Sequence, residues 1–408
     1  MSDSSTVAVP EIPSWLQRVC RLLEDEYPGM WQRFAAESGQ AEVREAVNLD
    51  LLRSAEPLPE PNHPELYERA RSLAETLDLD ARDLCLYRSK QAEPAARAAV
   101  AADPLVPRII FNMTFESVGD GGPDFLLAHE LAHVKLWNVN EGRLLVALQM
   151  LSAAGCQDHA APVFRQTLRV FSDLVEIWCD CVATALTGSV EPLLVAGEPA
   201  ARVEIERQAA LRQASVQLRS ADGRPGQPLD LAGRLAAVRI WQAAAGTAWQ
   251  TITDSLRTTD SLAGLDLPGQ QAVARITRNL IRRIGEPKWM RNEASLAMAR
   301  QYFADFGADE FGRAATEPAG DPGPWWESYL LFVLLDFVTA NRQLQEPALA
   351  HVLGLADEAD CGEACRELAR RELRLRKKQI EQIENNRQQL FAEATVQRAS
   401  AQPDDRGP

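Results

Sequence analysis

The stretch DFLLAHELAHVKLW, residues 124–137, constrains this chain more than any other part of its sequence, because it places two of the chain's five histidines four positions apart. Residues i and i+4 of a helix face the same way, so His129 and His133 could present both imidazoles to one metal ion. Glu130 lies beside the first histidine and could reach a water molecule on that ion. The stretch therefore predicts a helix that carries two ligands of a catalytic metal ion. The alternative is a chance match in a segment rich in alanine and leucine.

A candidate third ligand lies downstream in LVEIWCDCVATALTG, residues 174–188. Glu176 and Asp180 are one helical turn apart among apolar neighbours that would bury them, and a buried carboxylate needs a partner. The alternative is an ordinary pair of solvated helix acids. A catalytic zinc takes three protein ligands and keeps one open position, so His129, His133 and Glu176 would form a complete set for one zinc ion per chain. The same set would bind cobalt or manganese. Asp180 could accept the second ring N–H of a ligating histidine.

The rest of the sequence predicts an α+β fold that is predominantly α-helical. A small sheet from the region 83–117 is expected to pack against two motif helices near 123–139 and 165–187. The predicted order is a helical N-terminal extension (1–55), a proline-rich linker (55–64), a metal-binding domain (64–245), a helical C-terminal domain (246–398) and a disordered tail (399–408).

The segment 355–398 contains few helix breakers and predicts one long helix. Its apolar residues have heptad-like spacing, but two arginines interrupt the seam, so a solvated helix packed on its own domain is favoured over a dimerising coiled coil. The apolar positions are Leu373, Ile380, Ile383 and Leu390, and the interruptions are Arg376 and Arg387. A basic stretch at 275–291 is interpreted as a solvated helix face rather than an anion or partner site.

Charge and hydropathy exclude several function classes. A net charge of −15 and a pI near 5.0 argue against general affinity for nucleic acid or anionic membrane. The apolar run 329–340 is too short to cross a bilayer and carries Asp336, so a buried helix and no membrane insertion are expected. No export signal is visible, and seven cysteines without regular spacing suggest the reducing cytoplasm. The pairs Cys179/Cys181 and Cys361/Cys365 are interpreted as buried thiols, not metal ligands.

The motifs HELAH and EIWCD together resemble the gluzincin metallopeptidases, whose pattern is H-E-x-x-H followed by E-x-x-x-D. Within that clan, residues 80–190 most resemble the HtpX and CAAX prenyl endopeptidase family. The resemblance implies a zincin-like core in which His129, His133 and Glu176 hold zinc, Glu130 is the general base and Asp180 orients His129. It also implies a peptide or protein substrate extended along the strand 108–115, at Ile110, Phe111 and Asn112, by β-strand addition.

The sequence departs from that family at two points. Its members usually carry transmembrane helices, and they place a His-Pro segment followed by an arginine after the third ligand. The nearest match here is GQPLDLAGR, residues 226–234, with Gln227 in place of a histidine. Arg234 is therefore a candidate oxyanion stabiliser. His159, in CQDHAAPVF, is a second candidate, with a surface-loop histidine as the alternative.

The ImmA/IrrE-like metallopeptidases share the same two motifs at a shorter spacing. The separation of 43 positions between His133 and Glu176 favours the first family. A protein of the ImmA/IrrE type would act on a transcriptional repressor.

These observations predict a soluble, cytoplasmic zinc peptidase that hydrolyses peptide bonds with metal-activated water and Glu130 as general base. The helical regions 1–55 and 246–398 would restrict access or bind a regulatory protein partner, the latter through the C-terminal helices. Two other functions remain open. One is a scaffold that keeps a structural zinc, although a retired enzyme would readily lose Glu130. The other is a hydrolase of non-peptide bonds, which the expected edge strand disfavours.

Overall fold

The computed structural model describes residues 9–90, 98–101, 108–111, 122–155, 161–190, 199–219, 228–244, 247–257, 261–313 and 326–401. These residues are predominantly helical and include one small sheet, as the α+β prediction requires. The chain divides into two compact units, Met1–Thr258 with Ala263–Pro268, and Thr259–Leu262 with Gly269–Pro408. The first unit thus contains the predicted N-terminal extension together with the metal-binding motifs.

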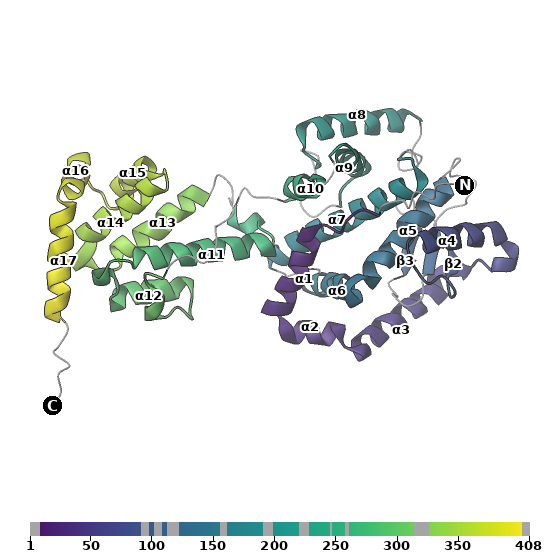
Figure 1. The fold of residues 1–408 in the computed structure, drawn as a ribbon, viewed down its shortest axis with the longest axis horizontal. Helices are drawn as coiled ribbons and strands as arrows, with labels where there is room; N and C mark the ends of the chain where they lie inside the picture. The colour runs from purple at the N-terminus through teal and green to yellow at the C-terminus, as the bar shows by residue number, and fades with distance from the viewer. Residues whose placement is uncertain are drawn as a thin grey trace, which may run out of the picture. The chain divides into compact units, whose positions relative to one another are not determined.

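Within the part of the chain that the structure describes, the first unit contains helices α1 to α10 and strands β1 to β4, of which Figure 1 labels the helices and the strands β2 and β3. Its helices are α1 (Ser14–Glu26), α2 (Pro28–Ala35), α3 (Glu37–Ser54), α4 (Pro64–Thr76), α5 (Gly122–Asn138), α6 (Arg143–Gly155), α7 (Pro162–Thr187), α8 (Pro199–Ser215), α9 (Leu231–Ala243) and α10 (Ala248–Leu256). Its strands are β1 (Ala55–Pro57), β2 (Cys85–Ser89), β3 (Ala98–Ala101) and β4 (Arg108–Phe111).

The sheet has the strand order β1-β2-β4-β3, in which β2 and β4 are parallel and both outer strands are antiparallel. Successive strand residues point to opposite faces. Leu86, Ile109 and Phe111 accordingly enter the main core, whereas Tyr87 and Ile110 pack against residues of α3 and β1 on the other face. The alternation explains how so short a sheet is covered on both sides.

Two sequence predictions about this sheet are wrong. The strand expected at the edge, β4, is interior, because β3 pairs with it from Ala98 opposite Phe111 to Ala101 opposite Arg108. The segment 55–64 is also more than a linker, since its first residues form β1 and Leu58 is buried. Proline is tolerated there because β1 lies at the sheet edge, where a missing N–H need not break the ladder.

The two motif helices are α5 and α7, which pack against each other in the first unit. They match the helices predicted near 123–139 and 165–187. Helix α7 begins with Pro162, whose fixed φ suits the first turn, and ends at Gly188, which has a φ of 71°. Both helices are buried over most of their surface, so their polar residues lie inside the unit.

The second unit has its own hydrophobic core, formed by buried residues from 281 to 394. Its helices are α11 (Leu267–Ile284), α12 (Glu293–Tyr302), α13 (Trp326–Thr339), α14 (Gln345–Glu358), α15 (Gly362–Glu372), α16 (Lys377–Asn385) and α17 (Arg387–Ala401). The first two residues of α11 belong to the other unit. Helix α13 covers the apolar run 329–340 up to Thr339, and one side of it is buried in the core of the second unit, whereas Phe332 is exposed. Within the described ranges, no helix is long and apolar enough to span a membrane.

The single long helix predicted for 355–398 is wrong. The chain turns after α14 and again after α15, where Asp360 and Arg374 adopt positive φ values of 58° and 54°. Neither residue is a glycine, so neither of these two positions predicts a left-handed backbone from its residue type. Ile380 and Ile383 are buried in the core of their own unit, which agrees with the preference against a coiled coil. The predicted tail begins within α17, and residues 402–408 lie outside the described part.

Arginines of the basic stretch 275–291 form ion pairs with glutamates of the second unit. Arg278 and Arg282 both bind Glu310, and Arg283 pairs with Glu358.

The cysteines described are free, and all but Cys85 are buried. Burial raises the pKa of the thiols of Cys179 and Cys181 well above its usual value, as expected for buried thiols.

Candidate metal centre

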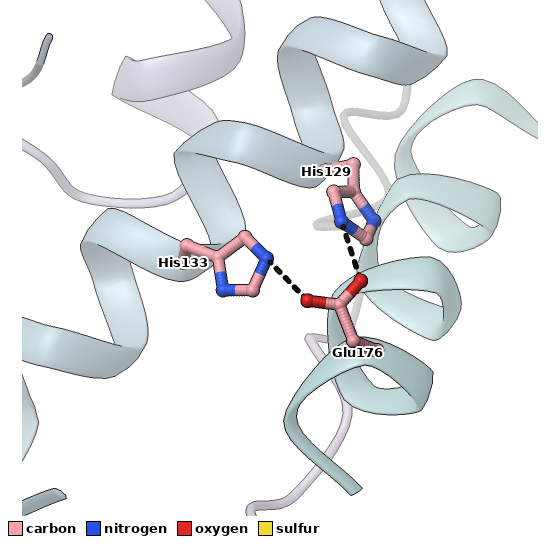
Figure 2. A group of neighbouring side chains, drawn as sticks. All are labelled: His129, His133 and Glu176. Atoms are coloured by element: carbon pink, nitrogen blue, oxygen red, sulfur yellow. Dashed lines mark ion pairs between the residues drawn. The ribbon is translucent and has the colours of Figure 1, made fainter. Parts of the chain in front are cut away.

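Helices α5 and α7 bring the two predicted histidines and Glu176 together (Figure 2). The Nε2 atom of His129 lies 3.5 Å from one carboxylate oxygen of Glu176, and the Nε2 atom of His133 lies 3.4 Å from the other. One ligand atom from each residue falls within 4.8 Å of the others. This group could hold a metal ion.

The spacing of these atoms suits an ion better than hydrogen bonds. A distance of 3.4–3.5 Å is longer than the 2.7–3.2 Å of a good N–H···O bond. Ligand atoms bound to a tetrahedral zinc at about 2.0–2.2 Å lie roughly 3.3–3.6 Å apart, by simple geometry. Two imidazoles and one carboxylate also leave one of four positions open, as in catalytic zinc sites. The donor set therefore fits a metal ion that keeps one position open, as zinc does in catalytic sites.

Asp180 lies behind His129, one turn along α7 from Glu176. Its Oδ1 atom is 3.0 Å from Nδ1 of His129, the nitrogen that does not face Glu176. The ring nitrogen is close to the carboxylate, although the contact is not aligned well enough to count as a hydrogen bond. The side chain of Asp180 is fully buried, so its charge acts on the histidine with little solvent screening.

Arg234, from the first turn of α9, binds both acids of α7. Its Nε and Nη2 atoms each donate to Asp180 at 2.7 Å, and its Nη1 atom lies 3.0 Å from Glu176. Asp230 caps the N-terminus of α9 by accepting from the backbone N–H of Gly233. This cap fixes the start of the helix that carries Arg234.

Neighbouring charges keep the carboxyl groups of Glu176 and Asp180 ionised. Burial alone would raise the pKa of Glu176 and Asp180, but the histidine contacts and Arg234 outweigh it and lower both values. Burial likewise opposes the charged form of His129, but Asp180 and Glu176 raise its pKa to about 10. Metal binding is therefore expected to release a proton.

Glu130 is buried beside this group, with only 4% of its surface exposed. Burial raises the pKa of its carboxyl, although the charges of His129 and His133 partly oppose the shift. A carboxyl group with a raised pKa is a stronger base than an ordinary glutamate once it is ionised. Its burial next to the two histidines therefore suits a role in proton transfer.

Trp137 also belongs to this site, although the sequence reasoning missed it. Its ring stacks on that of His133, with the centroids 6.0 Å apart and the planes at 22°. Trp137 is one helical turn after His133, so its i+4 spacing was the available signal. The stack restricts the orientation of the second ligand.

The other predicted site residues have different outcomes. The contacts of Arg234 go to Asp180 and Glu176, which places it among the groups that position the ligands. Phe111 is buried in the core and Ile110 faces α3, so these side chains do not line an edge groove. His159 and Asn112 lie outside the described residues.

A cavity of about 540 Å³ adjoins Glu176 and Arg234. Arg165 and Arg169 of α7 also line it. Sequence analysis missed both arginines, although they lie on the same helix as Glu176 at spacings that place them on one face.

Comparison with known proteins gives no match to a family model, a curated protein or a solved structure. The function of the site must therefore be argued from its own residues.

Proposed function

We propose that this protein is a zinc-dependent peptidase of the gluzincin type, with a zincin-like core built around α5 and α7. The observation that carries the proposal is the convergence of His129, His133 and Glu176, with the buried Glu130 beside them. Ligands alone would suit a structural site as well. A buried acid adjacent to them, which the ion does not need for binding, favours catalysis.

Each residue has a distinct part in this proposal. His129, His133 and Glu176 would hold the ion, which supplies a Lewis acid and lowers the pKa of water. Glu130 would accept a proton from the attacking water and deliver it to the leaving nitrogen, as the new C–O bond forms and the C–N bond breaks. Asp180 and Arg234 would keep His129 and Glu176 oriented.

A peptide substrate would pair with the backbone of β3. Among the described strands, β3 has β4 on one side only, and it lies next to α5. An exposed strand edge can bind an extended peptide through main-chain hydrogen bonds. This revises the predicted position of the substrate from β4 to β3 and keeps the mode of binding.

A scaffold with a structural zinc is the main alternative. It accounts for the ligands and for the helical second unit, but not for the retention and burial of Glu130. A peptidase of the ImmA/IrrE type, acting on a repressor, would use the same centre and differ only in substrate. The regulatory partner and the cytoplasmic location stay predictions.

The proposal is tested by metal analysis and peptide cleavage on three proteins, the wild type, Glu176→Ala and Glu130→Gln. Wild type should carry about one zinc per chain after supply and removal of excess metal, and Glu176→Ala should lose it. Glu130→Gln should keep the metal but cleave a mixed peptide library about 10²–10⁴ times more slowly.

The pattern across the variants separates the alternatives. Metal in wild type and in Glu130→Gln, with no cleavage by either, would support the scaffold. Absence of metal from the wild type would overturn the centre itself.

A further inference from the structure

Helix α7 carries three acids on one face. Asp173, Glu176 and Asp180 are three and four positions apart, so their side chains point the same way. Glu176 belongs to the candidate metal centre, and Asp180 contacts His129 in it. Asp173, one turn before Glu176, is only 3% exposed. A buried carboxylate needs partners, and the partners of Asp173 indicate its role.

The partners of Asp173 come from the two described ends of the segment between α8 and α9. One carboxylate oxygen forms an ion pair with Arg219, which lies shortly after α8. The other oxygen accepts the backbone N–H of Leu229 at 2.9 Å. Leu229 directly precedes Asp230, the N-cap of α9. These contacts therefore attach the entry of α9 to α7.

The first turn of α9 is tightly restrained, so a contact at Leu229 also positions Arg234. Asp230 accepts the backbone N–H of Gly233 at 3.0 Å, and both terminal nitrogens of Arg212 from α8 donate to it. An added Cβ at Gly233 would lie 2.6 Å from a methyl group of Leu229, so these two residues are in close contact. Arg234 follows directly, and its guanidinium binds the acids of the metal centre.

Asp173 and Asp180 thus attach the same segment to α7 at two points, one on each side of Glu176. The two acids are seven positions apart, which is about 10 Å along the helix axis. Asp173 accepts from Leu229, and Asp180 accepts from Arg234, five residues further along the chain. A single attachment would let α9 pivot on α7. Attachment at two points also fixes the direction from which Arg234 approaches Glu176.

We propose that Asp173 is a positioning residue of the metal centre. By keeping Leu229 against α7, it sets the direction from which Arg234 reaches Glu176 and Asp180, and zinc binding depends on that arrangement. Asp173 acts through Arg234 and is not a ligand. This role rests on the proposed zinc centre, and it applies whether that centre is catalytic or structural.

The test measures zinc affinity by competition with a fluorescent chelator, on variants whose folding is checked by circular dichroism. Asp173→Asn keeps the size of the side chain but loses its charge, and it should bind zinc about three to ten times more weakly than wild type. Asp173→Ala also removes the acceptor for the N–H of Leu229, and it should bind zinc about 10–100 times more weakly. Wild-type affinity in both variants would overturn the proposed role.

Asp266→Asn is the control for loss of a buried acid. Asp266 is buried in the same unit and accepts hydrogen bonds from two nitrogens of Arg257. This variant should keep the zinc affinity of wild type. An equal loss in Asp266→Asn and Asp173→Asn would assign the effect to general destabilisation and overturn the role of Asp173.

A double-mutant cycle with Arg234→Lys distinguishes positioning from an independent effect on structure. If Asp173 acts through Arg234, Asp173→Asn should weaken zinc binding less than about twofold once Arg234 has been replaced. A loss as large in the Arg234→Lys protein as in wild type would show that Asp173 acts independently of Arg234, against the proposal.

Measurements on wild type keep this role apart from the proposed peptidase function. If wild type binds zinc and both variants of Asp173 bind it equally well, only the role of Asp173 fails. If wild type cleaves no peptide but binds zinc more tightly than both variants, the peptidase proposal fails and the role of Asp173 stands. A wild type that binds no zinc would overturn both.

Discussion

The guanidinium of Arg234 donates to both carboxylate oxygens of Asp180, each at 2.7 Å. Two parallel N–H···O bonds fix the plane of the carboxylate as well as its position. One of these oxygens lies 3.0 Å from Nδ1 of His129. A chain of contacts therefore runs from α9 through α7 to α5, with Nδ1 of His129 next to Asp180 and Nε2 facing Glu176.

Asp180→Asn should weaken zinc binding about 10–100-fold, because the amide keeps the size of the carboxylate but not its charge on His129. Affinity is measured by competition with a fluorescent chelator. Asp266→Asn is a matched control, since Asp266 is buried and bound by two nitrogens of Arg257 in the same unit. Similar losses of affinity in both variants would show that the effect is general destabilisation.

Arg234→Lys should lower zinc affinity, because an ammonium cannot reproduce a planar fork that binds two carboxylates. The two interpretations of Arg234 differ in what changes at saturating zinc. If Arg234 positions Asp180 and Glu176, the loss appears mainly in metal affinity. If it stabilises an oxyanion, metal affinity is kept and kcat falls. Titration of zinc followed by rate measurement at saturation decides between them, and we expect the first result.

The ligands of this centre could be predicted from sequence because spacing within a helix determines which side chains share a face. The i+4 spacing alone predicts that His129 and His133 share a face. Glu176 and Asp180 could be predicted because they are one turn apart on a second helix with apolar neighbours. The partner of Asp180 could not be derived in this way. Arg234 is separated from it by more than 50 positions, and the contact depends on how α9 packs.

The fold class could be predicted from the sequence, but the strand order and two turns of the second unit could not. Helix periodicity located α5 and α7, but strand order depends on pairing between segments, which period-2 alternation does not specify. The strand β3 contains only alanine and valine and has no distinctive pattern, so the sequence predicts β4, and not β3, as the edge. The turns at Asp360 and Arg374 were missed because ordinary residues adopt the left-handed conformation there.

Gly233→Ala should destabilise the first unit by about 1–3 kcal/mol, because overpacking forces backbone or side-chain shifts. A Cβ at this position would lie 2.4 Å from the backbone oxygen of Leu218 and 2.6 Å from a methyl group of Leu229. Gly233 precedes Arg234, so zinc affinity should fall as well. Urea unfolding and chelator competition measure the two effects. Gly29→Ala is the control, because no atom lies within 4 Å of its added Cβ, and no loss of stability is expected there.

Glu310→Gln should destabilise the second unit at neutral pH by about 2 kcal/mol, a typical contribution of hydrogen bonds to charged groups. Glu310 accepts from Arg278 at 2.6 and 2.9 Å and from Arg282 at 2.7 Å, and its side chain is only 11% exposed. The bonds from Arg278 are the main cause that lowers the pKa of Glu310 from 4.5 to about 2. The folded pKa is therefore below the unfolded one.

The sign of the pH dependence follows from that difference. The stabilisation by Glu310 is fully present above about pH 4.5 and is lost as pH falls toward 2. The difference in unfolding free energy between wild type and Glu310→Gln should thus be constant from pH 7 to 5 and shrink below pH 4.5. Urea unfolding followed by circular dichroism at several pH values measures it. Glu358→Gln is the control, because its pair with Arg283 is exposed and should contribute less than about 1 kcal/mol. A difference for Glu310→Gln that persists unchanged to pH 3 would show that its ion pairs do not stabilise this unit.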